Sequence, residues 1–311
     1  MSKHTVKGLR RQFKAQGKFH TPPELVATIA ALAKTQLIGE PREVYDPTCG
    51  AGDLLSTWGD IPKYGQDIDA EAVEDAQSNL TNFHGVVGDV LTDPAWLDKR
   101  FHLIVANPPF SIKWTPQEDE RFEEAPTIPT QSKADYAFIL HILHMLDDDG
   151  VAVVMGFPGI LYRGGREGKI RQWLVEQNLI SHVVSIPGGK FEDTAIATCI
   201  LIIQKCRERV GVEFIDMEHE LQRFVKPKGL ESNDFNLAVS SYVQPPDPER
   251  EPIDPWELQQ QARAQAIDRL QKDLAIDRMV CELEGWNHEL YRQQLMAVLN
   301  GQEIIEMEAA A

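Results

Sequence analysis

The sequence predicts a doubly wound α/β fold, with a seven-stranded, mostly parallel sheet and a helical C-terminal extension. Between about residues 42 and 216, short apolar runs alternate with stretches of helical periodicity, a pattern typical of a parallel sheet covered on both faces. A proline-rich stretch at 244–255 separates this region from one long helical pattern. With 311 residues, of which 42% are hydrophobic, the chain can bury such a core. Sheets of this kind bind ligands at the carboxyl ends of their strands.

Seven apolar runs are the predicted strands, and four helical patterns precede or connect them. The strands are expected at 42–46, 63–67, 85–87, 101–107, 150–157, 182–186 and 198–204. The helices are expected at 23–35, 70–79, 134–146 and 166–177. Thr21 and Glu24 have the spacing of a capping box at the start of the first helix. The acidic stretch 111–133 has little periodicity and is expected to be a mobile lid.

Four segments make up the predicted domain organisation. Residues 1–20 form a basic N-terminal arm, 21–243 the α/β domain, 244–255 a proline-rich linker and 256–311 a helical C-terminal extension. A helix predicted at 256–283 has one apolar stripe, formed by Leu258, Ala262, Ile267, Leu270, Leu274 and Cys281. Such a stripe indicates either packing on the α/β domain or docking against another chain.

The charge distribution limits how this chain can meet nucleic acid. A formal net charge of −17 argues against unaided binding to DNA, because DNA affinity depends mainly on neutralising phosphates. The basic side chains gather at 1–20 and in a second cluster, which consists of Arg163, Arg166, Lys169 and Arg171. We therefore expect contact through these basic edges or through a basic partner.

Several other classes are excluded by composition. No apolar run reaches the roughly 18 residues of a membrane-spanning helix, and the polar N-terminus is not a signal peptide. The four cysteines lie far apart, which argues against a zinc site or a disulfide scaffold and favours the reducing cytoplasm. His141 and His144 have no partner cysteine or acid motif, so we interpret them as structural and expect no metal.

A glycine-containing loop follows the first predicted strand. Leu55 stands where a dinucleotide fingerprint has its third glycine, so pyrophosphate binding is weakly supported and a plain strand-to-helix turn remains the alternative. Glycines in this loop permit a tight turn and close approach to a ligand. The candidate binding residues are Asp46, Pro47, Thr48, Gly50 and Gly52.

Two further carboxylates end the next two strands. Asp67 can accept hydrogen bonds from the hydroxyls of a ribose, whereas Asp69 is better explained as the cap of the helix that follows. Asp89 can accept a hydrogen bond from an adenine amino group, and a turn aspartate is an equally good interpretation of it.

The sharpest motif follows the fourth strand and consists of Asn107, Pro108, Pro109 and Phe110. The two prolines fix the backbone and remove two N–H donors. The Asn107 amide oxygen and the Pro108 carbonyl are then rigid acceptors, which draw a donated amino group towards tetrahedral geometry and free its lone pair to attack a methyl group. Phe110 offers a face on which a planar substrate stacks. A polyproline-like turn is the alternative.

Over residues 17–216 the sequence resembles the N6-adenine DNA methyltransferases that form the modification subunits of type I restriction systems. The resemblance includes Phe19, His20, Thr21 and Pro22, then the loop at 44–55, the strand at 64–69 and the NPPF motif. It continues through Asp135–Phe138, Leu161–Gly165 and the pair Ile170 and Arg171, and reaches Pro187 and Phe191. The order, with the F-x-T-P segment ahead of the cofactor loop, is the family's gamma arrangement.

This resemblance implies the class I S-adenosylmethionine-dependent methyltransferase fold and S-adenosyl-L-methionine as the methyl donor. It implies methylation of adenine N6 in DNA, with the target base flipped out of the duplex. Phe19, His20, Thr21 and Pro22 are expected to help bind the methionine end of the cofactor. The protein is expected in the cytoplasm of a bacterium or as a phage product, within a restriction-modification or phage DNA-modification system.

The sequence departs from the family at several points. His20 stands where tyrosine is usual, and Asp67 where the longer glutamate is usual. We do not find the family's large N-terminal helical domain or an ordinary target-recognition domain in the sequence. DNA sequence choice is therefore expected to come from a separate specificity subunit, with the predicted helix at 256–283 as its docking element. A second copy of this chain is another candidate for that helix.

Other functions remain open at this point. NPP-aromatic motifs also serve methylation of cytosine N4 in DNA, of adenine in RNA and of glutamine in proteins. An inactive, DNA-associated scaffold subunit is a further alternative from a different functional class.

Overall fold

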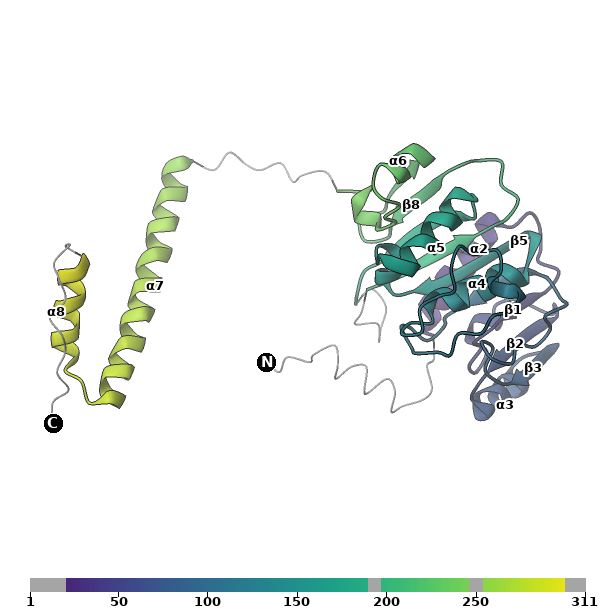
Figure 1. Cartoon of the computed structure of the whole chain (residues 1–311), viewed down its shortest axis with the longest axis horizontal. Coiled ribbons are helices and arrows are strands. Elements are labelled where there is room, and N and C mark those ends of the chain that lie inside the picture. Colours follow the sequence, from purple (N-terminus) through teal and green to yellow (C-terminus); the bar gives the residue numbers. More distant parts are fainter. Residues whose placement is uncertain (1–20, 190–196, 246–253, 300–311) are drawn as a thin grey trace. The chain divides into compact units, whose positions relative to one another are not determined.

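The computed structural model describes residues 21–189, 197–245 and 254–299. The predicted basic arm, with Phe19 and His20, lies outside the described residues, and so does Phe191. The chain divides into two compact units, Met1–Pro245 and Pro246–Ala311. Figure 1 shows both units, which are described separately below.

One mixed sheet forms the centre of the first unit. Its strands, in chain order, are β1 (Val44–Asp46), β2 (Lys63–Asp67), β3 (Phe83–Val87), β4 (Phe101–Ala106), β5 (Leu146–Gly156), β6 (Ile180–Ile186), β7 (Thr198–Ile203), β8 (Val212–Asp216) and β9 (Leu221–Val225). Their order in space is β3-β2-β1-β4-β5-β7-β6-β8-β9. The first five in this order are parallel, whereas β7 runs antiparallel to β5 and β6.

The sheet therefore has nine strands, two more than the sequence analysis predicts. Strand β8 pairs in parallel with β6, and β9 pairs antiparallel with β8 at the sheet's edge. Most of the residues in β9 are not buried, so this edge strand lacks the continuous apolar run by which the central strands were recognised. The doubly wound, mostly parallel architecture itself is confirmed.

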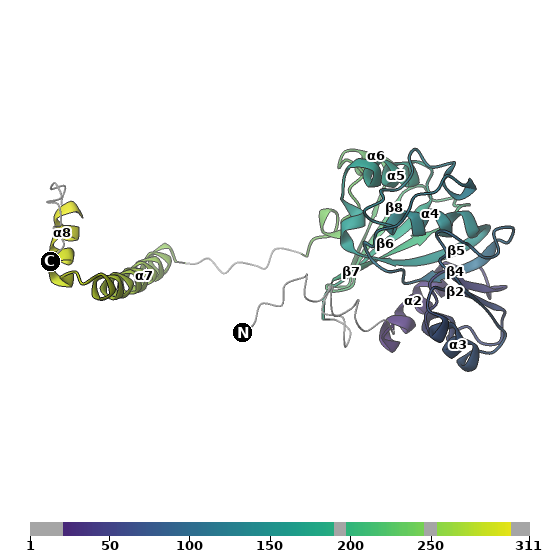
Figure 2. The ribbon, with the colours of Figure 1, turned by 60° about the horizontal axis from the view of Figure 1, so that its bottom comes forward.

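Helices cover both faces of the sheet because successive strand residues point to opposite sides. Val44, Leu103 and Val105 face one side, where α2 (Pro23–Gln36) and α3 (Ala70–Asn79) pack. Tyr45, Ile104 and Ala106 face the other side, where α4 (Asp135–Met145) and α5 (Gly165–Glu176) pack. Figure 2 shows these two helical layers on opposite sides of the strands. The short helix α6 (Pro227–Glu231) follows β9.

Two local expectations are wrong. The capping box does not form, because Pro22 is the N-cap of α2 and no side-chain bond caps the helix. The stretch 111–133 is not a loose lid: it contains the 3₁₀ helix η2 (Glu120–Phe122) and buries Trp114, Arg121 and Phe122. Arg121 binds the carbonyl oxygens of Val90 and Leu91, each at 2.8 Å, and thereby anchors the loop.

The second unit contains α7 (Pro255–Glu284) and α8 (His288–Leu299). The side chain of Asp254 caps α7 at Trp256 N, and Gly285, with φ of 70°, ends the helix. Cys281 is the buried apolar residue of α7. The other members of the predicted stripe include Leu258, Ile267 and Leu270, which are more than half exposed. No helix in the described ranges is long and apolar enough to cross a membrane.

Candidate functional site

The candidate site lies where the sheet changes its direction of winding. From β1 the chain proceeds to β2 and β3 on one side, then returns to β4 and β5 on the other. Ligands of doubly wound sheets bind at the carboxyl ends of the strands that flank such a switch point. Asp46 is the last residue of β1, Asp67 is the last residue of β2, and Asn107 directly follows β4. The sequence signals at the ends of β1, β2 and β4 therefore lie at one end of the sheet.

The structure brings Asn107 and Thr21 together, although they are far apart in the sequence. The Asn107 amide donates from Nδ2 to Thr21 Oγ1 over 3.3 Å. Thr21 is itself buried, and its backbone N–H donates to Asp53 Oδ2 over 2.9 Å. Because Nδ2 of the planar Asn107 amide is hydrogen-bonded to Thr21, the amide oxygen is directed away from Thr21. Thr21 thus binds the Asn107 side chain and does not cap α2, the role that its spacing in the sequence suggested.

The loop after β1 is built around positive-φ glycines. Gly50 and Gly52 have φ of 50° and 87°, in the left-handed region that favours glycine. A Cβ on Gly52 would lie 2.5 Å from Leu80 Cδ1, so a side chain at this position would also force the Leu80 side chain to move. Within the loop, Asp46 Oδ1 accepts a hydrogen bond from Thr48 N at 2.9 Å. The loop is therefore a fixed turn that joins β1 to the 3₁₀ helix η1 (Asp53–Leu55).

Asp67 links the first two strands of the site. Its Oδ2 accepts a hydrogen bond from Gly50 N at 2.8 Å, and its Oδ1 accepts from Asp69 N at 3.0 Å. Asp69 caps α3 through Glu71 N and Ala72 N, which confirms the role assigned to it from the sequence. Each carboxylate oxygen of Asp67 has a second lone pair for a ligand hydroxyl.

Asp89 occupies the next turn, beyond β3. Its Oδ1 accepts a hydrogen bond from Leu91 N at 2.9 Å, which is the geometry of a turn aspartate. The neighbouring Gly88 N donates to Asp67 O at 2.9 Å and so holds the ends of β2 and β3 side by side. Asp89 can both stabilise the turn and bind a ligand, because the hydrogen bond within the turn uses only Oδ1 and not Oδ2.

Sequence analysis missed an apolar member of the site. Ile68 lies between Asp67 and Asp69 in the strand-to-helix turn, and 74% of its surface is exposed. An isoleucine next to a candidate ribose ligand can cover one face of a flat base. In the sequence, Ile68 is a single apolar residue between two acids, a pattern that cannot be distinguished from the end of a buried strand.

Burial sets the electrostatics of the loop after β1. Asp46 is 1% exposed, and this desolvation raises its pKa to about 8, with a smaller opposing effect from its hydrogen bond to Thr48. Burial also raises the pKa of the Cys49 thiol, with the neighbouring Asp46 carboxylate adding to the effect. Cys49 is therefore a protonated packing residue near neutral pH and not a nucleophile.

One of the two histidines that the sequence left as structural, His141, is part of a buried network. His141 contacts Tyr45 OH through Nε2 at 3.1 Å and Arg121 Nη1 through Nδ1 at 3.3 Å. Burial, reinforced by the Arg121 charge, lowers the pKa of His141 well below its usual range. Among the residues that the structure describes, no three His, Cys, Asp or Glu side chains gather as metal ligands.

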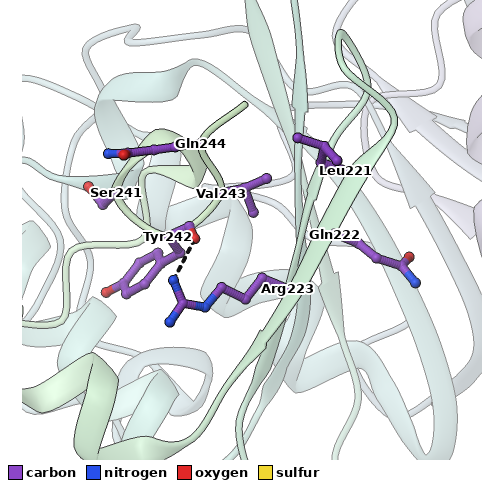
Figure 3. A pocket seen from close by; sticks show the side chains of 7 residues that line it. All are labelled: Leu221, Gln222, Arg223, Ser241, Tyr242, Val243 and Gln244. Carbon is purple, nitrogen blue, oxygen red and sulfur yellow. Dashed lines mark hydrogen bonds between the residues drawn. The ribbon is translucent and has the colours of Figure 1, made fainter. Parts of the chain in front are cut away.

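A separate pocket lies at the far edge of the sheet. Figure 3 shows it between β9 and the 3₁₀ helix η4 (Val239–Ser241), with Arg223 Nη1 donating to Tyr242 O at 3.0 Å. Strands β5, β7, β6 and β8 separate β9 from β4. This pocket is therefore distinct from the candidate site.

Comparison with known proteins agrees with this arrangement. Residues 9–284 match the family model described as N-6 DNA Methylase. The MpnII methylase subunit of a type I restriction enzyme from Mycoplasma pneumoniae is 34% identical over 263 residues, which cover 74% of this chain and 48% of that protein.

Solved structures agree as well. A type I restriction-modification system methyltransferase subunit from Streptococcus thermophilus has a TM-score of 0.66 at 26% identity, over 73% of this chain and 60% of that chain. A structure from Listeria monocytogenes, described as a class I S-adenosylmethionine-dependent methyltransferase, shares the fold with a TM-score of 0.51 at 16% identity. That match covers 75% of this chain and 77% of the other.

The chain spans about half the length of the curated relatives it matches, with 48%, 56% and 50% of three of them covered. The family match nevertheless extends over most of this chain, from the basic N-terminal segment into α7. Its first unit has the class I S-adenosylmethionine-dependent methyltransferase fold. The protein therefore belongs to the N-6 DNA methylase family.

Proposed function

We propose that this protein transfers a methyl group from S-adenosyl-L-methionine to the N6 amino group of adenine in DNA, within a restriction-modification or phage DNA-modification system. The observation that carries the proposal is the Asn107 amide, oriented by Thr21 at the end of β4 and next to the loop from β1. The similarity to type I methylase subunits supports both the substrate and the biological system.

The NPPF motif carries the catalytic role in this proposal. The Asn107 amide oxygen and the Pro108 carbonyl accept the two N–H groups of the target amine, so its lone pair is directed at the methyl group. Pro109 keeps the turn rigid, and Phe110 stacks on the flipped base. The cationic nitrogen formed on transfer is acidic and loses its proton to water, so no strong base is needed.

The residues at the ends of β1, β2 and β3 fit an adenine nucleoside with a charged tail. Asp67 accepts from the ribose hydroxyls, Ile68 covers one face of the adenine, and Asp89 accepts from its amino group. The positive-φ Gly50 and Gly52 allow the loop to approach the ligand closely. Asp46, Pro47 and Thr48 complete that loop, and Thr21 and Pro22 border the methionine end. Phe19 and His20, which the sequence also assigns to that end, lie outside the described residues. When bound, the cofactor supplies an electrophilic methyl group.

DNA recognition is proposed to require a partner. The net charge of −17 disfavours unaided binding, and the relatives include subunits of multi-chain type I enzymes. The exposed apolar side chains of α7, among them Trp256, Leu258 and Ile267, suit docking to a specificity subunit, or alternatively to a second copy of this chain. Because its proposed substrate is intracellular DNA, we expect the protein in the cytoplasm of a bacterium, encoded by the bacterium or by a phage.

The test is transfer of an isotope-labelled methyl group from S-adenosyl-L-methionine to unmethylated DNA, read by mass spectrometry of the digested nucleosides. We expect N6-methyladenine. Label in N4-methylcytosine, in RNA adenine or in a protein glutamine would assign the same chemistry to another substrate. No binding of S-adenosyl-L-methionine by calorimetry would favour an inactive scaffold subunit.

A variant separates catalysis from binding. Asn107→Ala removes the side-chain acceptor and is expected to abolish methyl transfer while cofactor affinity stays within about twofold. Transfer at the wild-type rate in this variant would contradict the assigned role of Asn107.

A further inference from the structure

Three charged side chains lie together beside the NPPF motif, outside the set that the proposed reaction uses. Arg163 Nη1 lies 3.8 Å from Asp135 Oδ2 and 3.5 Å from Glu167 Oε1, and both carboxylate side chains are 5% exposed. These separations are those of ion pairs and exceed ordinary hydrogen-bond lengths. In the part of the chain that the structure describes, none of these three atoms has a hydrogen-bond partner. Buried polar atoms without hydrogen-bond partners are rare, so this cluster needs an explanation beyond its own ion pairs.

The cluster contacts the residue that follows the motif. Asp135 Oδ1 accepts a hydrogen bond from Ser111 N at 3.1 Å, and Arg163 Nη2 donates to Ser111 Oγ at 3.3 Å. Ser111 has φ of 53°, a left-handed conformation that costs a residue with a side chain about 1–2 kcal/mol. Contacts to both its backbone and its side chain hold Ser111 in this conformation. Asp135 also borders a small pocket together with Pro108 and Phe110.

The position of Arg163 is itself built into the fold. A Cβ on Gly159 would lie 2.5 Å from Arg163 Nε and Nη2, so the guanidinium occupies space that only glycine leaves open. Gly159 lies in the 3₁₀ helix η3 (Pro158–Leu161). Arg171 Nη1 donates to Arg163 O at 2.7 Å, which fixes the backbone that carries this side chain. Segments from β4, α4 and the turn after β5 thus converge on Ser111.

We propose that Arg163 and Asp135 are positioning residues that hold the catalytic turn 107–111 in the geometry for methyl transfer. This inference rests on the proposed function for its consequence in catalysis, but the contacts to Ser111 do not depend on it. Arg163 acts through Ser111 and does not touch the reacting atoms. It also keeps the two neighbouring carboxylates of Asp135 and Glu167 from repelling each other, so that Asp135 remains in place to accept from Ser111 N.

The experiment measures amide hydrogen exchange of the full chain by mass spectrometry, without DNA, for peptides that span 105–114. Gly159→Ala retains every charge but forces the guanidinium of Arg163 aside, and Arg163→Gln removes the charge. We expect both variants to exchange about tenfold faster in these peptides, as for loss of one hydrogen bond, while the rest of the sheet exchanges at the wild-type rate. Arg163→Lys, which restores the charge, is expected to recover part of the protection.

Arg42→Gln is the matched control. Arg42 is also shared between two carboxylates, those of Asp147 and Asp149, but on the surface and away from the NPPF motif. This variant is expected to leave exchange at 105–114 unchanged. Unchanged exchange there in Gly159→Ala, or an equal increase across the whole sheet, would overturn the proposal. If Arg163→Gln does not fold, the exchange of Gly159→Ala alone tests the proposal.

Kinetics provide the second measurement. With methyl transfer established for the wild type, Gly159→Ala is expected to lower kcat on the order of 100-fold with little change in KM for S-adenosyl-L-methionine. A rise in KM at constant kcat would assign Arg163 to cofactor binding instead and refute positioning. If the wild type neither binds S-adenosyl-L-methionine nor transfers its methyl group, the proposed function fails, whereas the exchange measurement still tests the contacts to Ser111.

Discussion

Replacing Arg121 by methionine removes the anchor of the loop at 111–133 and keeps a long side chain in its place. The Arg121 side chain is 1% exposed and donates to Asp119 Oδ1 and Oδ2 at 2.9 and 2.6 Å. It also donates to the carbonyl oxygens of Val90 and Leu91. Breaking a buried ion pair by removing one partner typically costs 3–5 kcal/mol. Because the Asp119 side chain is 28% exposed and water can partly solvate it, we expect about 3 kcal/mol, at the lower end.

The assay is urea unfolding at pH 7, followed by circular dichroism, with Arg100→Met as the control. Arg100 also donates to two backbone carbonyls, those of Leu97 and Lys99, but it does so at the surface. Its replacement is expected to cost no more than about 0.5 kcal/mol. An Arg121→Met free energy of unfolding within about 1 kcal/mol of the wild type would refute the argument that this arginine fixes the loop.

The same variant tests the link between the loop and the cofactor site. Val90 and Leu91 directly follow Asp89, the residue proposed to bind adenine. Loss of Arg121 therefore releases the turn that holds Asp89 in place. We expect the dissociation constant of S-adenosyl-L-methionine to rise about tenfold by calorimetry, as for one weakened hydrogen bond. An unchanged constant in a destabilised variant would separate the two roles.

Three further changes test the loop after β1 and its surroundings. Gly52→Ala is expected to cost about 2 kcal/mol or more in urea unfolding, because its φ of 87° and the 2.5 Å approach to Leu80 both oppose a Cβ. Gly59→Ala, with positive φ but open space, is its control and should cost about 1 kcal/mol. The raised pKa of Asp46, about 8, means that the native state holds a proton that the unfolded state releases above about pH 4. This group therefore lowers the free energy of unfolding by about 1.4 kcal/mol for each pH unit between about pH 5 and 7. Asp46→Asn should lack this contribution to the pH dependence of stability. The same pH dependence in wild type and variant would count against a raised pKa for Asp46. Ile68→Ser should leave unfolding unchanged to about 0.5 kcal/mol, since the side chain is exposed, but weaken cofactor binding about tenfold by calorimetry.

The central strands could be predicted from the sequence because their burial on both faces requires continuous apolar runs. Strand β4, from Phe101 to Ala106, is buried at every residue and ends at the motif that the sequence made most prominent. Strand β9 could not be found in this way, because it lies at an edge and exposes Gln222 and Arg223. Local patterns thus report burial and say little about pairing at the edge of a sheet.

The parts of the candidate site that the sequence did not reveal depend on contacts between distant segments. Thr21 has the spacing of a helix cap, and only the fold shows that its hydroxyl accepts from Asn107 instead. Arg121 lies in a polar stretch without periodicity, because its partners are backbone carbonyls that carry no sequence signature. Arg163 and Asp135 belonged to recognised motifs, but their common contact, Ser111, has no distinguishing residue type.

The bond between Asn107 and Thr21 joins residues that are 86 positions apart, and the bond from Thr21 to Asp53 spans 32. Contacts of such sequence separation close large loops and form late, after the local elements of the chain have ordered. The orientation of the Asn107 amide, which we propose to be catalytic, is therefore acquired only when β4 has joined β1 and Thr21 has docked. During refolding, the sheet should become protected before the amide is fixed. A partly folded chain would then have the shape of the domain without a competent site.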